Sequence, residues 1–249
     1  MMDRIGYEEE RKVRFFQIDS NSCMTPAALL SSLQEMAITH SDTLGYTIDY
    51  MLEHHWFWSV LNWHLKLYRM PKYGEKIFLQ TWNDKFARFQ ANRSFFILDE
   101  EGNKLLEGVS RWVFMDLEKR KPTNVPEGMA EKYHAGQLSA IEGEKFLMPK
   151  EPEGELICSR DVVVTRRDTD TNGHANNVKY LEWVMDDIPD EIYVDMALKD
   201  IRIVYRKECM RGDTVTVKTF LKDVEEGKEV GSFLYDGETI VAQVITLWQ

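Results

Sequence analysis

Three polar side chains at alternating positions precede a predicted helix in the second half of the chain. They are Asp170, Asn172 and His174, within the segment RRDTDTNGHANNVKYLEWVMDD at residues 166–187. Alternate residues of an extended loop face the same side, so these three can converge on one pocket. A loop that enters a helix N-terminus also presents unpaired N–H groups and the positive end of the helix dipole. This pattern suits the stabilisation of a developing oxyanion, although the same residue types also serve as ordinary helix caps.

A carboxylate and a thiol follow at Glu208 and Cys209, at the end of the predicted strand DIRIVYRKEC. Because neighbouring strand residues point to opposite faces, we expect only one of the two to reach the site. A carboxylate beside a histidine can act as a general base, and a thiol beside a histidine can act as a nucleophile. The simpler interpretations are a salt bridge from Glu208 to Arg206 or Arg211, and an inert, buried Cys209.

The chain contains an internal repeat with a constant offset of 151 residues. Residues 15–37 align without gaps with residues 166–188. The aligned pairs that matter are Asp19 with Asp170, Asn21 with Asn172, and Cys23 with His174. Near Met70 and Pro71, where the first copy corresponds to Glu208 and Cys209, neither a carboxylate nor a thiol is present. Capping alone would need no histidine in one copy only, so we predict one active site per chain, in the second copy.

The residue pattern of each copy predicts a short strand, a polar loop, an amphipathic helix and several antiparallel strands. Pro26 suits the first turn of the first helix, and Asn176 and Asn177 suit the N-cap of the second. Residues 95–114 and 232–249 each have the pattern of a hairpin. A helix that buries its apolar face on an antiparallel sheet, formed twice, is an α+β architecture. We predict an N-terminal repeat at 1–125, a linker at 126–155 and a C-terminal repeat at 156–249.

The composition of the chain argues against several classes of partner and site. The 249 residues carry a formal charge of −11, which disfavours nucleic acid as a partner. No run of eighteen apolar residues occurs, and the first fifteen residues lack the apolar core of a signal peptide, so we expect a cytoplasmic protein without a membrane partner. The three cysteines are widely spaced without a CxxC pair, which argues against a zinc site. We expect neither a metal nor a cofactor.

Two tracts resemble a known family. DTDTNGHANNVKYLEW at 168–183 is similar to the Asp-x-Asn-x-His-x-Asn-Asn-x-Lys-Tyr signature of the acyl-ACP thioesterases, and YRKEC at 205–209 is similar to that family's Tyr-Arg-x-Glu-Cys tract. The likeness extends over essentially the whole chain. These plant and bacterial enzymes release fatty acids from acyl carrier protein, and their fold is a double hotdog, two tandem sheets that each wrap a long helix. Without a plastid transit segment, this chain looks like a bacterial member.

The resemblance implies catalytic roles for Asp170, Asn172, His174 and Glu208 in thioester hydrolysis. We predict that Glu208, aided by His174, deprotonates a water, while Asn172 and N–H groups at the helix start hold the thioester oxygen. Asp170 either orients its neighbours or attacks the carbonyl itself. A rival mechanism makes Cys209 the nucleophile, which requires a lowered thiol pKa. We rank it second because the two acids and the amide already supply a base and an oxyanion donor.

The sequence signals for substrate and partner contacts are less specific than those for the catalytic residues. By the resemblance, the first repeat holds much of the acyl pocket, and the aromatic stretch at 50–68 offers Trp56 and Trp58 for a tunnel or for core packing. Asn176 and Asn177 are further candidates for substrate contact. An acidic acyl carrier protein needs a basic patch on this acidic chain. Candidates that flank the site are Arg166, Arg167, Lys179, Arg206, Lys207 and Arg211. The resemblance also suggests a homodimer.

Three other functions remain open. An acyl-CoA thioesterase would use the same chemistry with a different docking surface. A hotdog dehydratase or hydratase has an Asp-x-Asn-Pro-x-His motif, which is one residue longer than the segment here, and no Pro follows Asn172. A non-catalytic acyl-binding protein would carry a decayed site, which describes the first repeat better than the second.

Overall fold

Both repeats fold with the same strand order in a computed structural model that describes residues 6–143, 146–170 and 173–249. The first repeat contains β1 (Tyr7–Lys12), η1 (Phe15–Gln17), α1 (Pro26–Thr43), α2 (Ile48–Glu53), β2 (Trp56–Leu67), β3 (Lys76–Phe86), β4 (Gln90–Leu98), β5 (Lys104–Asp116), β6 (Lys121–Pro122) and α3 (Met129–Lys132). The second contains β7 (Glu155–Val163), η2 (Arg166–Asp168), α4 (Asn177–Met185), α5 (Asp190–Tyr193), β8 (Leu198–Tyr205), β9 (Thr214–Val224), β10 (Gly227–Asp236) and β11 (Thr239–Trp248). The predicted α+β architecture is confirmed.

Within each copy, the strands pair with one another in the same relative order. Their orders are β1-β3-β4-β5-β2 and β7-β9-β10-β11-β8, and the strand pairs with described registers are antiparallel. The predicted hairpins at 95–114 and 232–249 are β4 with β5 and β10 with β11. Two tandem copies of one topology are therefore present, as the internal repeat predicts.

Contacts divide the described chain into two compact units. Unit 1 comprises residues up to Met24, Ala28–Trp63 and Pro71 onward to 143, and unit 2 comprises Thr25–Ala27, His64–Met70 and the described residues from 146 to the end. The stretch predicted as a linker contributes α3, whose Met129 and the following Tyr133 are buried in the core of unit 1. The predicted repeat boundaries stay a prediction.

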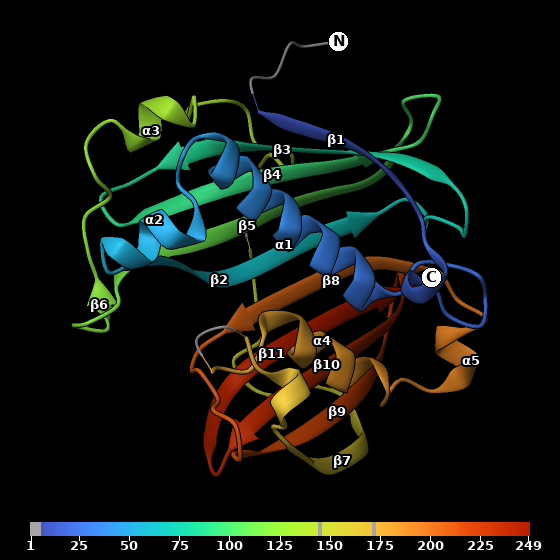
Figure 1. The fold of residues 1–249 in the computed structure, drawn as a ribbon. Helices are drawn as coiled ribbons and strands as arrows, with labels where there is room; N and C mark the ends of the chain where they lie inside the picture. Colours follow the sequence, from blue (N-terminus) through green and yellow to red (C-terminus); the bar gives the residue numbers. More distant parts are fainter. Residues whose placement is uncertain (1–5, 144–145, 171–172) are drawn as a thin grey trace. The chain divides into compact units, whose positions relative to one another are not determined.

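Helix α1 begins at Pro26, as predicted, because proline has no N–H to lose at the first helical position and its fixed φ suits the helix. Its apolar positions Leu29, Leu30, Leu33 and Met36 are fully buried, and the helix lies along one face of the unit 1 sheet (Figure 1). The helix ends before Gly45, which adopts the left-handed conformation that glycine tolerates.

Helix α4 has 9 residues against 18 in α1. It begins after Asn176, which caps it as predicted, and it buries Val178, Leu181 and Val184 while contacting β9 and β11. Pro189 follows closely and disfavours helical geometry at the residue before it, so the chain turns into the short α5 instead of extending the helix. The second copy of the predicted long helix is therefore truncated.

A polar cluster interrupts the apolar interior of unit 1. Arg93 is 5% exposed and donates from Nη1 to Nδ1 of His40 at 2.9 Å and to Oγ1 of Thr81 at 3.2 Å. Its guanidinium also lies 5.6 Å from the ring centre of Tyr133. Burial and the neighbouring Arg93 lower the pKa of His40 to about 3, so this histidine is neutral.

Among the residues that the structure describes, no helix is both long enough and apolar enough to cross a membrane.

Candidate active site

The predicted loop before α4 is held by backbone hydrogen bonds to one aspartate. The N–H of Asp170 donates to the carbonyl of His174 at 2.8 Å, and the N–H of His174 donates to Oδ1 of Asp170 at 3.1 Å. Gly173, with φ +79°, closes the turn in the left-handed region by donating to the carbonyl of Asp170. Asp170 therefore fixes the backbone of residue 174.

Glu208 lies beside this loop. His174 and Met210 form an isolated antiparallel bridge, and the N–H of Ala175 donates to the carbonyl of Cys209 at 2.8 Å. This junction brings Nε2 of His174 to 3.3 Å from Oε2 of Glu208. The histidine side chain is 15% exposed and the glutamate side chain 40%, so the pair is accessible from one side. The structure thus brings together the histidine and the distant acid that the sequence singled out.

Cys209 is buried, unlike Glu208 next to it. It is 1% exposed, whereas the neighbouring Glu208 reaches His174. Both residues follow the end of β8 at Tyr205, so the expectation that alternation along a strand turns only one of them to the site stays a prediction. Burial raises the pKa of the Cys209 thiol, although the Tyr180 side chain hydrogen-bonds to it and opposes that shift. A thiol with a raised pKa is a poor source of thiolate at neutral pH.

The start of α4 supplies capping and donor groups. Oδ1 of Asn176 accepts the N–H of Val178 at 3.0 Å, and the carbonyl of Asn177 accepts the hydroxyl of Tyr205 at 2.8 Å. Both asparagines therefore have structural contacts, and their contact with a substrate stays a prediction. Asn172, the predicted oxyanion donor, lies outside the described residues.

Trp56 and Trp58 lie on β2 and pack against the aromatic core of unit 1. Their ring centres are 5.4 and 4.8 Å from that of Phe114, and Trp58 also meets Phe86 edge-on. Core packing, one of the two predicted roles, is present, and acyl contact stays a prediction.

Three of the predicted docking cations are already engaged. Lys179 pairs with Glu182 at 2.6 Å, Lys207 pairs with Asp236 at 2.7 Å, and Arg206 donates to Gln243 at 2.9 Å. The other three, Arg166, Arg167 and Arg211, are exposed. The described residues contain no group of three or more His, Cys, Asp or Glu arranged to hold a metal ion.

Two family patterns cover most of the chain: residues 5–133 match the acyl-ACP thioesterase N-terminal domain, and residues 155–249 match the acyl-ACP thioesterase C-terminal domain. The chain belongs to the acyl-ACP thioesterase family. Oleoyl-acyl carrier protein thioesterase 1 of Arabidopsis thaliana, a chloroplast protein, is 27% identical over 228 residues. That match covers 86% of this chain and 63% of the relative, so the chain spans less than two thirds of the relative's length.

Solved structures of acyl-ACP thioesterases share the fold. A protein described as an oleoyl thioesterase, from Lactobacillus plantarum, has a TM-score of 0.90 at 22% identity, with 100% of this chain and 97% of that chain covered. An acyl-ACP thioesterase from Bacteroides thetaiotaomicron has a TM-score of 0.85 at 24% identity, with 98% and 97% covered. The predicted double hotdog is confirmed by this likeness.

Proposed function

We propose that this acyl-ACP thioesterase family member hydrolyses the thioester of acyl-ACP to a free fatty acid and holo-ACP, in fatty acid biosynthesis. The observation that carries the proposal is the 3.3 Å pair of His174 and Glu208 at the entrance to α4. A carboxylate hydrogen-bonded to an imidazole can take a proton from water and pass one on to a leaving group. The substrate, acyl-ACP, is proposed from membership of the family, and the reaction is proposed from the residues of the site.

In the proposed reaction, the His174–Glu208 pair removes a proton from a water, whose oxygen attacks the thioester carbonyl carbon. The negative charge that develops on the carbonyl oxygen is stabilised by Asn172 and by backbone N–H groups where α4 begins. One such group is the N–H of Asn177, which donates to no acceptor among the described residues. Collapse of the intermediate breaks the C–S bond, and the proton held by the pair moves to the sulfur of the leaving thiol.

We assign Asp170 to positioning. Its Oδ1 accepts the backbone N–H of His174, which aims the imidazole, and an oxygen used in this way is poorly placed to attack a carbonyl. Replacement of Asp170 by Asn keeps an oxygen acceptor but cannot form an anhydride, so a positioning role leaves D170N with measurable turnover. Complete loss of turnover in D170N, with intact folding, would favour the carboxylate as nucleophile.

Free fatty acid release from acyl-ACPs of graded chain length tests the activity. We expect turnover by the wild-type chain and a loss of about 10²- to 10⁴-fold in kcat for E208Q, because the amide cannot accept the proton. Acyl-CoA and enoyl-ACP, assayed in parallel, report on the acyl-CoA thioesterase and the hydratase alternatives. Absence of release from every acyl-ACP, or hydration of enoyl-ACP instead, would overturn the proposal.

For docking of the acidic carrier protein, we propose Arg166, Arg167 and Arg211, the exposed cations that flank the site. The double variant R166E/R167E should raise KM for acyl-ACP far more than KM for a small acyl thioester. K150E, at an exposed lysine of the same unit, matches the single variants R166E and R167E in net charge and is compared with each of them. Equal changes for both substrates would remove these arginines from the docking surface. A homodimer and a cytoplasmic location stay predictions of the sequence.

A further inference from the structure

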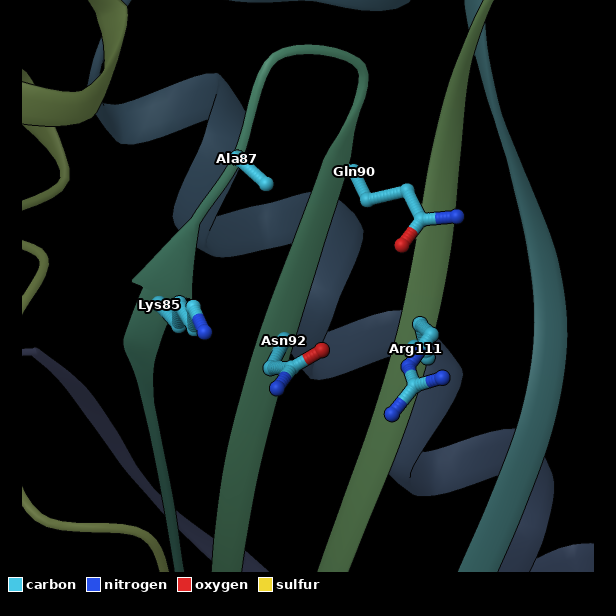
Figure 2. A pocket seen from close by; sticks show the side chains of 5 residues that line it. All are labelled: Lys85, Ala87, Gln90, Asn92 and Arg111. Carbon is cyan, nitrogen blue, oxygen red and sulfur yellow. The ribbon is translucent and has the colours of Figure 1, made fainter.

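A row of polar side chains crosses three strands of unit 1. Lys85 on β3 is the register partner of Asn92 on β4, and Asn92 is the register partner of Arg111 on β5. Gln90, two residues before Asn92, points to the same face because side chains alternate along a strand. Figure 2 shows the four side chains on the face of the sheet turned away from α1, with Asn92 between Lys85 and Arg111.

These residues, with Ala87, line a pocket of about 200 Å³. Pockets for drug-sized ligands usually measure roughly 300–1,000 Å³, so this one suits an ion or a small group. Among the residues that the structure describes, no carboxylate lines it. Neither Lys85 nor Arg111 forms an ion pair with a described residue, and the side chains of Gln90 and Asn92 make no hydrogen bond there.

Other cations on the same sheet behave differently. Lys76 on β3 lies 3.4 Å from Glu10, and Lys104 on β5 lies 3.0 Å from Glu107. In a chain with 42 acidic and 31 basic residues, a hollow with two cations and no acid is a departure from its surroundings. Adjacent strands are about 4.8 Å apart, so Lys85 and Arg111 start about 10 Å apart, and their long side chains can both reach a ligand above Asn92.

A bulge in β3 produces this alignment. The register shifts between Asn83 and Lys85, so Asp84 is the extra residue. Asp84 is half-buried and not part of the pocket lining, and burial raises the pKa of its carboxyl. The acid nearest to Lys85 in sequence is therefore turned out of the pocket lining by the bulge.

We propose that this pocket binds a small dianion of the phosphate class. Arg111 can donate two parallel N–H bonds to two phosphate oxygens, Lys85 supplies a second point charge, and the amides of Gln90 and Asn92 add neutral donors. A single carboxylate would leave one of the two cations without a counter-charge, whereas a dianion with several acceptor oxygens uses the whole set. The proposal is independent of the hydrolysis assigned to unit 2.

Titration of the full-length chain with inorganic phosphate, against chloride at equal ionic strength, tests the site by calorimetry. We expect saturable binding to the wild-type protein. R111Q should weaken it about tenfold or more, because a charge-assisted bidentate contact is lost, and K85Q should weaken it severalfold. Both side chains are exposed, so neither change should disturb folding. K121Q removes an exposed lysine of unit 1 outside the pocket and should bind as wild type.

Either of two results would overturn the proposal: no difference between phosphate and chloride, or phosphate binding that R111Q and K85Q keep unchanged. A parallel titration with glycerol 3-phosphate separates the sources of the ligand. Tighter binding than for inorganic phosphate assigns the site to an organic phosphate monoester, and weaker binding assigns it to the free anion.

Discussion

Asp19 and Cys23 of unit 1 and Asp170 and His174 of unit 2 share the same hydrogen bonds and differ in the chemistry of their side chains. In unit 1, the N–H of Asp19 donates to the carbonyl of Cys23 at 2.9 Å, and the N–H of Cys23 donates to Oδ1 of Asp19 at 3.2 Å. Asp170 and His174 make the same two bonds in unit 2, at 2.8 and 3.1 Å. The aspartate is thus a feature of the loop in both copies.

The backbone hydrogen bond of the residue after Cys23 is also equivalent to that of the residue after His174. The N–H of Met24 donates to the carbonyl of Pro71 at 2.8 Å, as that of Ala175 donates to the carbonyl of Cys209. Pro71 therefore occupies the place of Cys209, and the residue before it, Met70, that of Glu208. At the two positions that form the His174–Glu208 pair, the first copy has cysteine for histidine and methionine for glutamate. A shared scaffold that positions a pair of side chains needs only those two changes to gain or lose a general base.

Exchange of the distinguishing residue should have the largest effect. H174C gives unit 2 the residue of unit 1 and should lower kcat/KM for acyl-ACP about 10²- to 10⁴-fold, because the imidazole of the pair is lost. The backbone bonds to Asp170 do not need the side chain, so folding should be kept. Steady-state kinetics and circular dichroism measure the two effects.

C23H is the matched control for that exchange. It places a histidine at the equivalent position of the first copy, where Met70 stands in place of the acid, and it should leave kcat/KM near the wild-type value. H174C with more than a tenth of wild-type activity, or C23H with a comparable loss, would mean that the two loops do not differ in the way their side chains indicate.

Unit 1 also carries a buried histidine that affects stability in acid. His40 of unit 1 stays neutral in the folded state down to a pKa of about 3, while an unfolded histidine takes up a proton near pH 6.5. Between these values the unfolded state binds more protons, so the free energy of unfolding falls as pH falls. The slope approaches about 1.4 kcal/mol per pH unit below pH 6, or roughly 2.5 kcal/mol between pH 6 and pH 4.

H40N isolates this term because it keeps an acceptor for Arg93 but cannot be protonated. We expect the loss of stability between pH 6 and pH 4, measured by urea unfolding, to be smaller in H40N than in the wild type. The comparison uses the slope with pH, since a general loss of packing would shift all pH values alike. Parallel curves for the two proteins would contradict the prediction.

Local and repeated signals made the scaffold predictable. Pro26 and Asn176 marked the two helix starts through their own backbone chemistry, and the gapless repeat placed Asp19 and Asp170 in equivalent turns. The approach of Glu208 to His174 could be inferred because a single copy carries both residues. What the repeat could not show was the length of α4, which depends on how the chain turns at Pro189.

The features that the sequence did not predict depend on strand register and on tertiary packing. The alignment of Lys85 with Asn92 and Arg111 depends on the bulge at Asp84, which nothing in the local sequence specifies. Arg93 shares its strand face with Ala91 and Phe95, but arginine is usually exposed, so its burial against His40 follows only from the packing of α1 on the sheet. The assignment of residues 126–155 to a linker stays a prediction, although Tyr133 contributes to the core of unit 1.

Removal of the shared aspartate should have a moderate effect on stability in both copies and an effect on turnover in one. Oδ1 of Asp19 accepts the N–H groups of Asn21 and Cys23, so D19A should cost about 1–2 kcal/mol with kcat unchanged. D170A should cost a similar amount and also lower kcat at least tenfold, because the backbone of His174 is released. Urea unfolding and fatty acid release measure the two quantities; equal losses of kcat in both variants would contradict the assignment.

The smallest effect on activity is expected at Cys209, the buried neighbour of Glu208. Its thiol is buried beside Tyr180 and has a raised pKa, so at neutral pH it is protonated and shielded from the substrate. C209A should therefore change kcat less than about threefold while lowering stability by roughly 1 kcal/mol through a small cavity. Alkylation by iodoacetamide, followed by mass spectrometry, should also modify Cys209 more slowly than Cys23, which is only partly buried. Loss of nearly all activity in a folded C209A protein would instead make the thiol the nucleophile, and would reduce Glu208 to a residue that orients the histidine.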